Sequence, residues 1–231
     1  MNKYISFKTF IFILKTLVLF FTINLTEEKD CTNEYLFKNS LENENEININ
    51  GSIEIKNDIT IKHKNTIKII GDKNSIINFN NRNKGINLNS IKEIYIKDTS
   101  IYGNIITNVV DKIYFKGVKI VGSMKLYNEI NTDYIFENCD FISIEKNEIS
   151  MAFEFYNSHP IFNNCTFYGN KNTSSILNYI GTNFLSNNIE IYNSYFNGNY
   201  ESICFNGIDS NIIIKNSKFY NCVDNYVYHG Y

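Results

Sequence analysis

The stretch Phe162-Asn-Asn-Cys-Thr-Phe167 decides the fold, because variants of it recur along the chain. Each copy begins and ends with Ile or Phe, has Asn, Asp or Gly in its third position, and has Thr, Val, Cys or Ser in its fourth. The copies begin 19 to 29 residues apart, at Ile96, Phe115, Phe136, Phe162, Ile191 and Ile214, and Ile67-Lys-Ile-Ile-Gly-Asp72 is a weaker earlier member. Internal repetition of this kind is typical of a solenoid.

The third position of each copy predicts a sharp bend between two short strands. Asn, Asp and Gly tolerate a left-handed backbone better than other residues do. Apolar and polar residues alternate on both sides of this position, as they do in half-buried strands. We therefore expect the small fourth residue and the flanking Ile and Phe to point inward. The third-position residues are Asp98, Gly117, Asn138, Asn164, Asn193 and Asn216.

Further strand-like runs between the copies complete about three short strands per repeat. One repeat cannot bury its apolar face alone, but stacked repeats can. The pattern predicts an all-β fold, a right-handed parallel β-helix of about seven coils. A leucine-rich repeat is the rival fold, but its repeat length is nearly fixed. Stacking of like positions predicts an inner ladder of Phe141, Phe167, Phe196 and Phe219, and a structural ladder of Asn138, Asn164, Asn193 and Asn216.

Over residues 47–228 the pattern resembles the right-handed parallel β-helix, or pectin-lyase-like, superfamily. The segments Phe162-Asn-Asn-Cys-Thr-Phe-Tyr-Gly-Asn170 and Ile191-Tyr-Asn-Ser-Tyr-Phe-Asn-Gly-Asn199 resemble the repeats of polymorphic outer-membrane and adhesin-type β-helix proteins. The second resemblance implies a role in adhesion. The first resemblance, to the pectin-lyase-like superfamily, implies a polysaccharide lyase or a glycoside hydrolase instead.

Residues 1–26 have the form of a secretory signal peptide. Lys3 and Lys8 make a basic start, and an apolar run from Phe10 to Phe21 is interrupted only by Lys15. No later segment has the length of a transmembrane helix, so we expect no membrane span after signal removal. The expected location is extracellular or at the cell surface.

The remaining chain divides into an N-terminal cap, residues 27–46, and the β-helix, residues 47–231. Within the cap, Thr32–Leu41 is expected to form a short amphipathic helix with Tyr35, Leu36 and Leu41 on one face. At the other end, Tyr226-Val-Tyr-His-Gly-Tyr231 reads as the start of another strand. Unpaired strand edges there would allow end-to-end self-association.

Composition and charge narrow the function classes. The formal net charge is −2, which provides no electrostatic footprint for nucleic acid. Five cysteines with long spacings and no Cys-x-x-Cys pair argue against a zinc site, and the size of the core argues against a disulfide scaffold. We expect no metal and no cofactor. Cys139 and Cys165 share one inward position and are expected to be free, packed thiols.

The sequence offers no catalytic residue. Asn131-Thr132-Asp133 matches one polygalacturonase tripeptide, but no second carboxylate is placed by the repeats to partner Asp133, and glycoside hydrolysis needs such a pair. The histidines fall on different coils and, on the repeat pattern, have no acid or cysteine at ligand spacing. We expect them to be surface or turn residues, and they are His63, His159 and His229.

The residue just before each copy should face outward, and most of these residues are apolar or aromatic. Stacked coils would bring them into an outer stripe of Tyr95, Tyr114, Ile135 and Ile161, continued by Glu190 and Ile213. One interpretation is that a loop covers the stripe or that composition alone explains it. The other is a docking strip for sugar rings or a protein partner, in which tyrosines supply flat amphipathic contacts.

Three functional hypotheses follow. The leading one is a secreted or cell-surface non-catalytic β-helix protein for adhesion, with a glycan or a surface protein as its partner. The second is a diverged carbohydrate-active enzyme. The third is a partial copy of a longer β-helix surface protein. The resemblance implies that a lyase would use acidic calcium ligands with an Arg or Lys base. The sequence shows no such group of residues, which favours the first hypothesis over the second.

Overall fold

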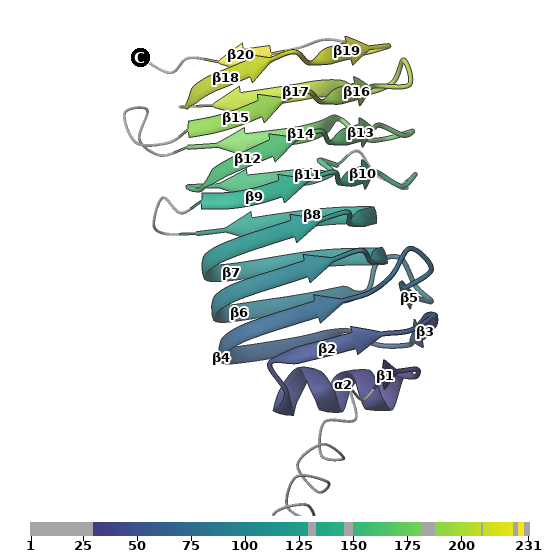
Figure 1. Ribbon diagram of the computed structural model, residues 1–231. Coiled ribbons are helices and arrows are strands. Elements are labelled where there is room, and N and C mark those ends of the chain that lie inside the picture. The colour runs from purple at the N-terminus through teal and green to yellow at the C-terminus, as the bar shows by residue number, and fades with distance from the viewer. Residues whose placement is uncertain are drawn as a thin grey trace, which may run out of the picture.

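The chain folds into a right-handed parallel β-helix with one short helix at its N-terminal end, as predicted (Figure 1). The computed structural model describes residues 30–128, 133–145, 150–181, 188–208, 210–223 and 226–228. The predicted signal peptide, residues 1–26, and His229 lie outside this range. Every pairing between the described strands is parallel, and the strands form three stacked faces.

The first face contains the strands that precede the Asn bend. Its members are β1 (Asp30–Cys31), β2 (Glu46–Ile49), the ends of β4 (Ile59–Ile70), β6 (Gly85–Lys97) and β7 (Ser100–Lys116), then β9 (Asp133–Glu137), β12 (His159–Asn163), β15 (Asn188–Tyr192) and β18 (Asn211–Lys215).

The second face follows the bend and carries the Phe ladder. It consists of β3 (Ser52–Ile55), β5 (Ile76–Phe79), the starts of β7 and β8 (Lys119–Tyr127), β10 (Asp140–Ile142), β13 (Thr166–Tyr168), β16 (Tyr195–Asn197) and β19 (Lys218–Tyr220).

The third face closes each coil. It consists of the starts of β4 and β6, the middle of β7, the end of β8, β11 (Phe153–Tyr156), β14 (Ser175–Ile180), β17 (Ile203–Ile208) and β20 (Tyr226–Tyr228). Each face above β1 has eight described layers, against about seven coils expected, because β2 and β3 begin a complete coil before the first recognisable copy of the repeat.

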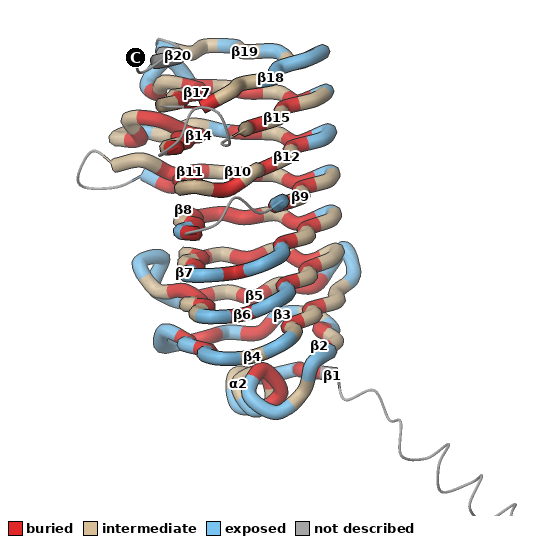
Figure 2. The backbone as a smooth tube through the Cα atoms, turned by 90° about the vertical axis from the view of Figure 1, so that its left-hand side faces the viewer, coloured by how far each residue is buried: buried red, intermediate tan, exposed pale blue. Residues whose placement is uncertain are grey.

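The core is a column of mostly apolar side chains inside the coils. Buried residues alternate with half-buried and exposed ones along the strands (Figure 2). The predicted Phe ladder is present: the ring centroids of Phe141 and Phe167 are 4.7 Å apart, those of Phe167 and Phe196 are 4.3 Å apart, and those of Phe196 and Phe219 are 4.6 Å apart. The rings lie nearly parallel, at 4° to 8°, because each coil repeats the same rotamer one layer higher.

The predicted bend is confirmed at the six full copies, those that begin between Ile96 and Ile214. The third-position residues have φ between +49° and +62°, which is the left-handed region. The fourth residue is buried in five of the six copies, as the alternation requires. The Asn side chains are exposed rather than enclosed, and their ladder is offset. Asn164 Nδ2 donates to Asn138 Oδ1 at 2.6 Å, whereas Asn193 Nδ2 donates to Asn163 Oδ1 at 3.0 Å.

A second left-handed bend joins the third face to the first. It recurs at equivalent positions of several coils, at His63, Ser90, Val109 and Asn157, with φ between +49° and +56°. Val109 is the unfavourable member, because a β-branched side chain fits this region poorly. Nothing in its packing requires valine, since its side chain is 42% exposed.

Replacing Val109 with Asn is expected to stabilise the fold by about 1 kcal/mol, because Asn adopts the left-handed conformation at lower cost. Asn157 already occupies the equivalent bend with φ of +49°. Denaturant unfolding would measure the change. Val223→Asn is the control, since Val223 is 61% exposed and outside the left-handed region. Equal effects of the two substitutions would contradict the role of the bend.

The capping helix α2 (Glu34–Asn43) lies beneath the first coil (Figure 1). Asn33 caps it, because its side chain accepts a hydrogen bond from the backbone N–H of Leu36 at 3.0 Å. The expected inward face was partly wrong. Phe37 and Leu41 are buried, while Tyr35 is 76% exposed. A register centred on Phe37 and Leu41 packs the phenylalanine of the helix against the coil and leaves Leu36 only partly buried.

The cysteines follow the expectation only in part. Cys139 and Cys165 are buried free thiols, as predicted. Cys204 and Cys222 form a disulfide, which the argument against a disulfide scaffold did not foresee. Cys204 lies in β17 and Cys222 follows β19 one coil later, so 18 residues of separation bring the two Cα atoms to 5.4 Å. A comparison of like positions in the repeats could not reveal this pair, because the two cysteines occupy different positions.

Candidate functional site

The outward column of the first face brings the predicted stripe together. Register pairs Tyr95 with Tyr114, Tyr114 with Ile135, and Ile135 with Ile161 on successive coils. The column continues through Glu190 to Ile213, as the spacing of the repeats requires. The four stripe residues are half-buried, because each covers part of the next one along the column.

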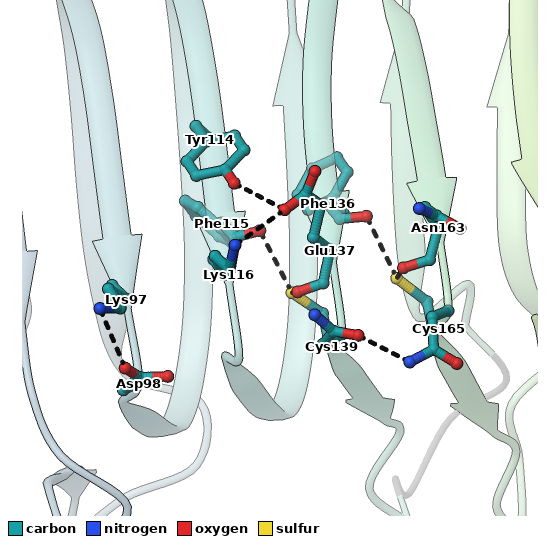
Figure 3. A network of polar contacts seen from close by, with 12 residues as sticks. Lys97, Asp98, Tyr114, Phe115, Lys116, Phe136, Glu137, Cys139, Asn163 and Cys165 are labelled. Atoms are coloured by element: carbon teal, nitrogen blue, oxygen red, sulfur yellow. Dashed lines mark hydrogen bonds and ion pairs between the residues drawn. The ribbon is translucent and has the colours of Figure 1, made fainter.

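The two tyrosines of the stripe form a rigid platform. Their ring centroids are 5.3 Å apart with an interplanar angle of 24°, and Lys68 Nζ lies 5.8 Å from the centroid of Tyr95. Tyr114 Oη donates to Glu137 Oε2 at 2.6 Å, and Lys116 Nζ lies 3.4 Å from the same carboxylate oxygen (Figure 3). These contacts fix the orientation of the Tyr114 ring.

The same contacts shift the pKa values of Tyr114 and Glu137 in opposite directions. The hydrogen bond to Glu137, with some burial, raises the pKa of Tyr114 to about 12. The donated bond from Tyr114, together with Lys116, lowers the pKa of Glu137. Tyr114 therefore stays a neutral phenol and Glu137 stays a carboxylate across the physiological range. A neutral phenol held by a carboxylate suits Tyr114 to a role in binding.

A cavity of about 520 Å³ lies beside this platform. Tyr114 and Ile135 of the stripe form part of its wall. Its other lining residues are Glu93, Asp111, Lys112, Ile113 and Asp133. Carboxylates are hydrogen-bond acceptors and the ammonium is a donor, so the cavity offers both kinds of partner next to a flat aromatic surface.

His159 joins three coils at the edge of this region. Its Nδ1 lies 2.8 Å from Asp133 Oδ1, and its Nε2 lies 3.0 Å from Glu190 Oε1. Tyr192 Oη donates to Glu190 Oε2 at 2.6 Å, and this bond, with His159, lowers the pKa of Glu190. The expectation that the histidines have no acid nearby was therefore wrong for His159.

This arrangement does not form the carboxylate pair of a glycosidase. An inverting glycosidase needs room for a water between its two carboxyl groups. Here the imidazole of His159 fills that space and bonds to both Asp133 and Glu190. The three side chains act as a brace that holds neighbouring coils together.

A second polar cluster lies on the outward side of the third face. The carboxylate of Glu154 is 6% exposed and forms an ion pair with Lys125 Nζ at 2.6 Å. Tyr156 Oη donates to Glu154 Oε2 at 2.5 Å, and the Tyr156 ring stacks on Tyr127 with centroids 4.5 Å apart. Next to Glu154 in register is Asn178, which is fully buried and whose Nδ2 has no acceptor among the described residues.

Burial and the carboxylate determine the ionisation of this cluster. Burial, followed by the bond to Glu154, raises the pKa of Tyr156. Burial alone would lower the pKa of Lys125, but the hydrogen bond and the charge of Glu154 outweigh it, so that this pKa is raised. Lys125 therefore keeps its proton as an ammonium, and the Tyr156 phenol stays neutral. No repeated motif marks these outward residues, so the repeat pattern did not predict the cluster.

Among the described residues, no group of three or more His, Cys, Asp or Glu side chains is arranged to hold a metal ion. In the same part of the chain, no helix has the length and apolar character that a membrane span requires. The disulfide between Cys204 and Cys222 is compatible with a protein outside the cytoplasm. Comparison with models of known protein families, with curated proteins and with solved structures gave no match to this chain.

Proposed function

We propose that this protein is exported and binds glycans along the first face without altering them, as a member of the pectin-lyase-like superfamily. The observation that carries the proposal is the stacked pair Tyr95 and Tyr114, of which Tyr114 lines a cavity of about 520 Å³. The apolar face of a pyranose ring packs against an aromatic ring, while its hydroxyls bond to carboxylates and amines. Glu93, Asp111 and Lys112 supply such partners around the cavity.

The shape of the first face suits a polymer more than a single sugar. Ile135 and Ile161 extend the column beyond the tyrosines, one residue per coil. Coils are spaced by about 4.8 Å, the distance between neighbouring strands of a sheet. A chain of sugars lying along the solenoid axis would therefore contact several coils at once. The adhesin-like repeats support the same conclusion, that the protein acts as a surface for attachment.

The experiment is a retention assay with a panel of polysaccharides, followed by calorimetry with soluble oligomers of any that bind. Replacing Tyr95 and Tyr114 together with Ser is expected to weaken binding at least about tenfold, because each ring contact contributes about 1 kcal/mol. Tyr35→Ser with Tyr168→Ser is the matched control, since these exposed tyrosines lie on the cap and the second face. Unchanged binding after the Tyr95 and Tyr114 substitutions would refute the proposal.

A second candidate function is a carbohydrate-active enzyme. The observation that favours it is the Lys125, Glu154 and Tyr156 cluster, which combines a carboxylate, an ammonium and a phenol within hydrogen-bond distance. This candidate ranks second because the Glu154 side chain is only 6% exposed and is already in an ion pair with Lys125. The same polysaccharide panel tests it through product release, which Glu154→Gln should abolish. Absence of products from the unaltered protein would eliminate this candidate.

A further inference from the structure

A separate pocket lies at the corner between the second and third faces, away from the stripe. It has a volume of about 560 Å³ and is built by the loops that follow β13, β16 and β19 (right-hand edge of Figure 1). Because three successive coils contribute one loop each, the pocket exists only when the coils are stacked. Its lining includes Lys171, Asn172, Ser174, Tyr200, Glu201 and Val223.

The first of these loops presents Asn172-Thr173-Ser174, an acceptor sequence for N-glycosylation. The backbone there is well fixed. The N–H of Ser150 donates to the carbonyl of Asn172 at 3.0 Å, and the N–H of Ser174 donates to the carbonyl of Ser150 at 3.0 Å. Thr173 Oγ1 bonds to Ser143 Oγ at 3.1 Å within the buried part of the corner. The acceptor asparagine is therefore held in one place, with its side chain lining the pocket.

We propose that Asn172 carries an N-linked glycan whose first sugar occupies this corner pocket and packs against Tyr200. In the transfer, the amide nitrogen Nδ2 of Asn172 forms a bond to C1 of the sugar. The bond between C1 and a phosphate oxygen of a lipid-pyrophosphate-linked oligosaccharide donor breaks. The lipid pyrophosphate leaves, and the amide loses one proton. The donor and the transferase belong to the secretory pathway, which the predicted signal peptide would allow the chain to enter.

The chemistry of the pocket suits a pyranose. The ring of Tyr200 is 74% exposed and offers a flat amphipathic surface at the rim. Ile203 and Val223 add apolar wall, while Lys171 and Glu201 provide a donor and an acceptor for hydroxyl groups. A sugar ring needs this combination of one apolar face and polar partners at its edge.

The disulfide supports the pocket in two ways. Cys204 and Cys222 directly adjoin the lining residues Ile203 and Val223 in the chain, so the bridge fixes both apolar walls at once. A disulfide also forms in an oxidising compartment, which is where N-glycosylation takes place. The bridge and the acceptor sequence thus point to the same compartment.

Other acceptor sequences begin at Asn24, Asn50 and Asn164. Asn24 lies outside the described residues. Asn164 donates its side-chain nitrogen to Asn138 in the exposed ladder, and Asn50 lies on an exposed turn before Gly51. Asn172 is distinguished from the last two because its side chain lines the corner pocket, so a sugar attached there finds a preformed surface.

The test is expression of the full chain behind a strong added secretion leader in a eukaryotic host. Glycopeptides are mapped by mass spectrometry in both the medium and the cell membranes, so that retained protein is also analysed. We expect a glycan on Asn172. The Asn172→Gln variant should lose one glycan, whereas the control variant Asn199→Gln should lose none. Protein that entered the pathway with Asn172 unmodified would overturn the proposal, whether or not Asn50 or Asn164 is modified.

Packing of the sugar against Tyr200 is tested separately. The measurement is the rate at which an endoglycosidase releases the Asn172 glycan from the folded protein. Tyr200→Ser is expected to raise that rate about fivefold, which corresponds to about 1 kcal/mol of ring contact. Tyr220→Ser is the control, since Tyr220 is 56% exposed and does not line the pocket. Equal rates for the original protein and Tyr200→Ser would show that the sugar does not occupy the pocket.

Discussion

Replacing Phe167 with Ala is expected to lower the free energy of unfolding by about 3–5 kcal/mol, the usual cost of removing a buried aromatic ring. Phe167 is fully buried and lies between Phe141 and Phe196, with ring centroids 4.7 Å and 4.3 Å away. The substitution removes both stacking contacts and leaves a cavity between coils. Because each coil of a solenoid contacts only its neighbours, this loss weakens the contact between the coils before Phe167 and the coils after it.

Chemical denaturation followed by circular dichroism would measure this change. Tyr168→Ala is the matched control, because the adjacent side chain points outward and is 37% exposed. We expect it to change stability by no more than about 0.5 kcal/mol. A broader or two-step transition for Phe167→Ala would indicate that the halves unfold separately. A cost below about 1 kcal/mol would contradict the view that the Phe ladder holds the coils together.

Replacing Lys125 with Met is expected to cost about 3 kcal/mol, because it leaves a buried carboxylate without its counter-charge. Glu154 is 6% exposed on its side chain and keeps only the hydrogen bond from Tyr156 after the substitution. The cost lies at the lower end for such pairs because Lys125 itself is 38% exposed. Adding Glu154→Gln to Lys125→Met should restore most of the stability, since the uncompensated charge is then removed.

Denaturant unfolding of the single and double variants gives this comparison directly. Lys97→Met serves as the control, because Lys97 and Asp98 form a pair at 3.5 Å in which both side chains are more than 40% exposed. An exposed pair of this kind contributes little, so we expect a change of no more than about 0.5 kcal/mol. If Lys125→Met costs no more than this control, the carboxylate of Glu154 is hydrated and the cluster is not a buried ion pair.

The candidate site on the first face could be predicted in part, because its residues have fixed positions relative to the repeat. Tyr95 and Tyr114 each stand one residue before a copy, so alignment of the copies was enough to place them side by side. The same alignment places Asp133 and His159 three residues before their copies, so that their pairing also follows from the repeat. Glu190 stands diagonally across from His159, and its contact depends on side-chain reach rather than on register.

The third-face cluster and the disulfide could not be predicted in this way. Lys125 and Glu154 lie after loops of different length, and no repeated motif marks their strands, so their register is set only by how the coils stack. Cys204 and Cys222 occupy different positions on neighbouring coils. In both cases the partners meet because the third face of one coil stacks on the layer before it. The segments that form the third face carry no recognisable pattern.

The sequence by itself determined the bend, the inward ladders and the class of fold. These features depend on local physics: a left-handed residue between two alternating strands, repeated often enough to stack. Only the tertiary structure decided which side chains meet across coils where the repeated motif does not set their register. Loops of unequal length decide which of these side chains come together. The results are the brace at His159, the buried pair of Lys125 and Glu154, and the corner pocket beside Asn172. Backbone geometry repeats with the motif, whereas contacts between exposed side chains depend on the register of each individual layer.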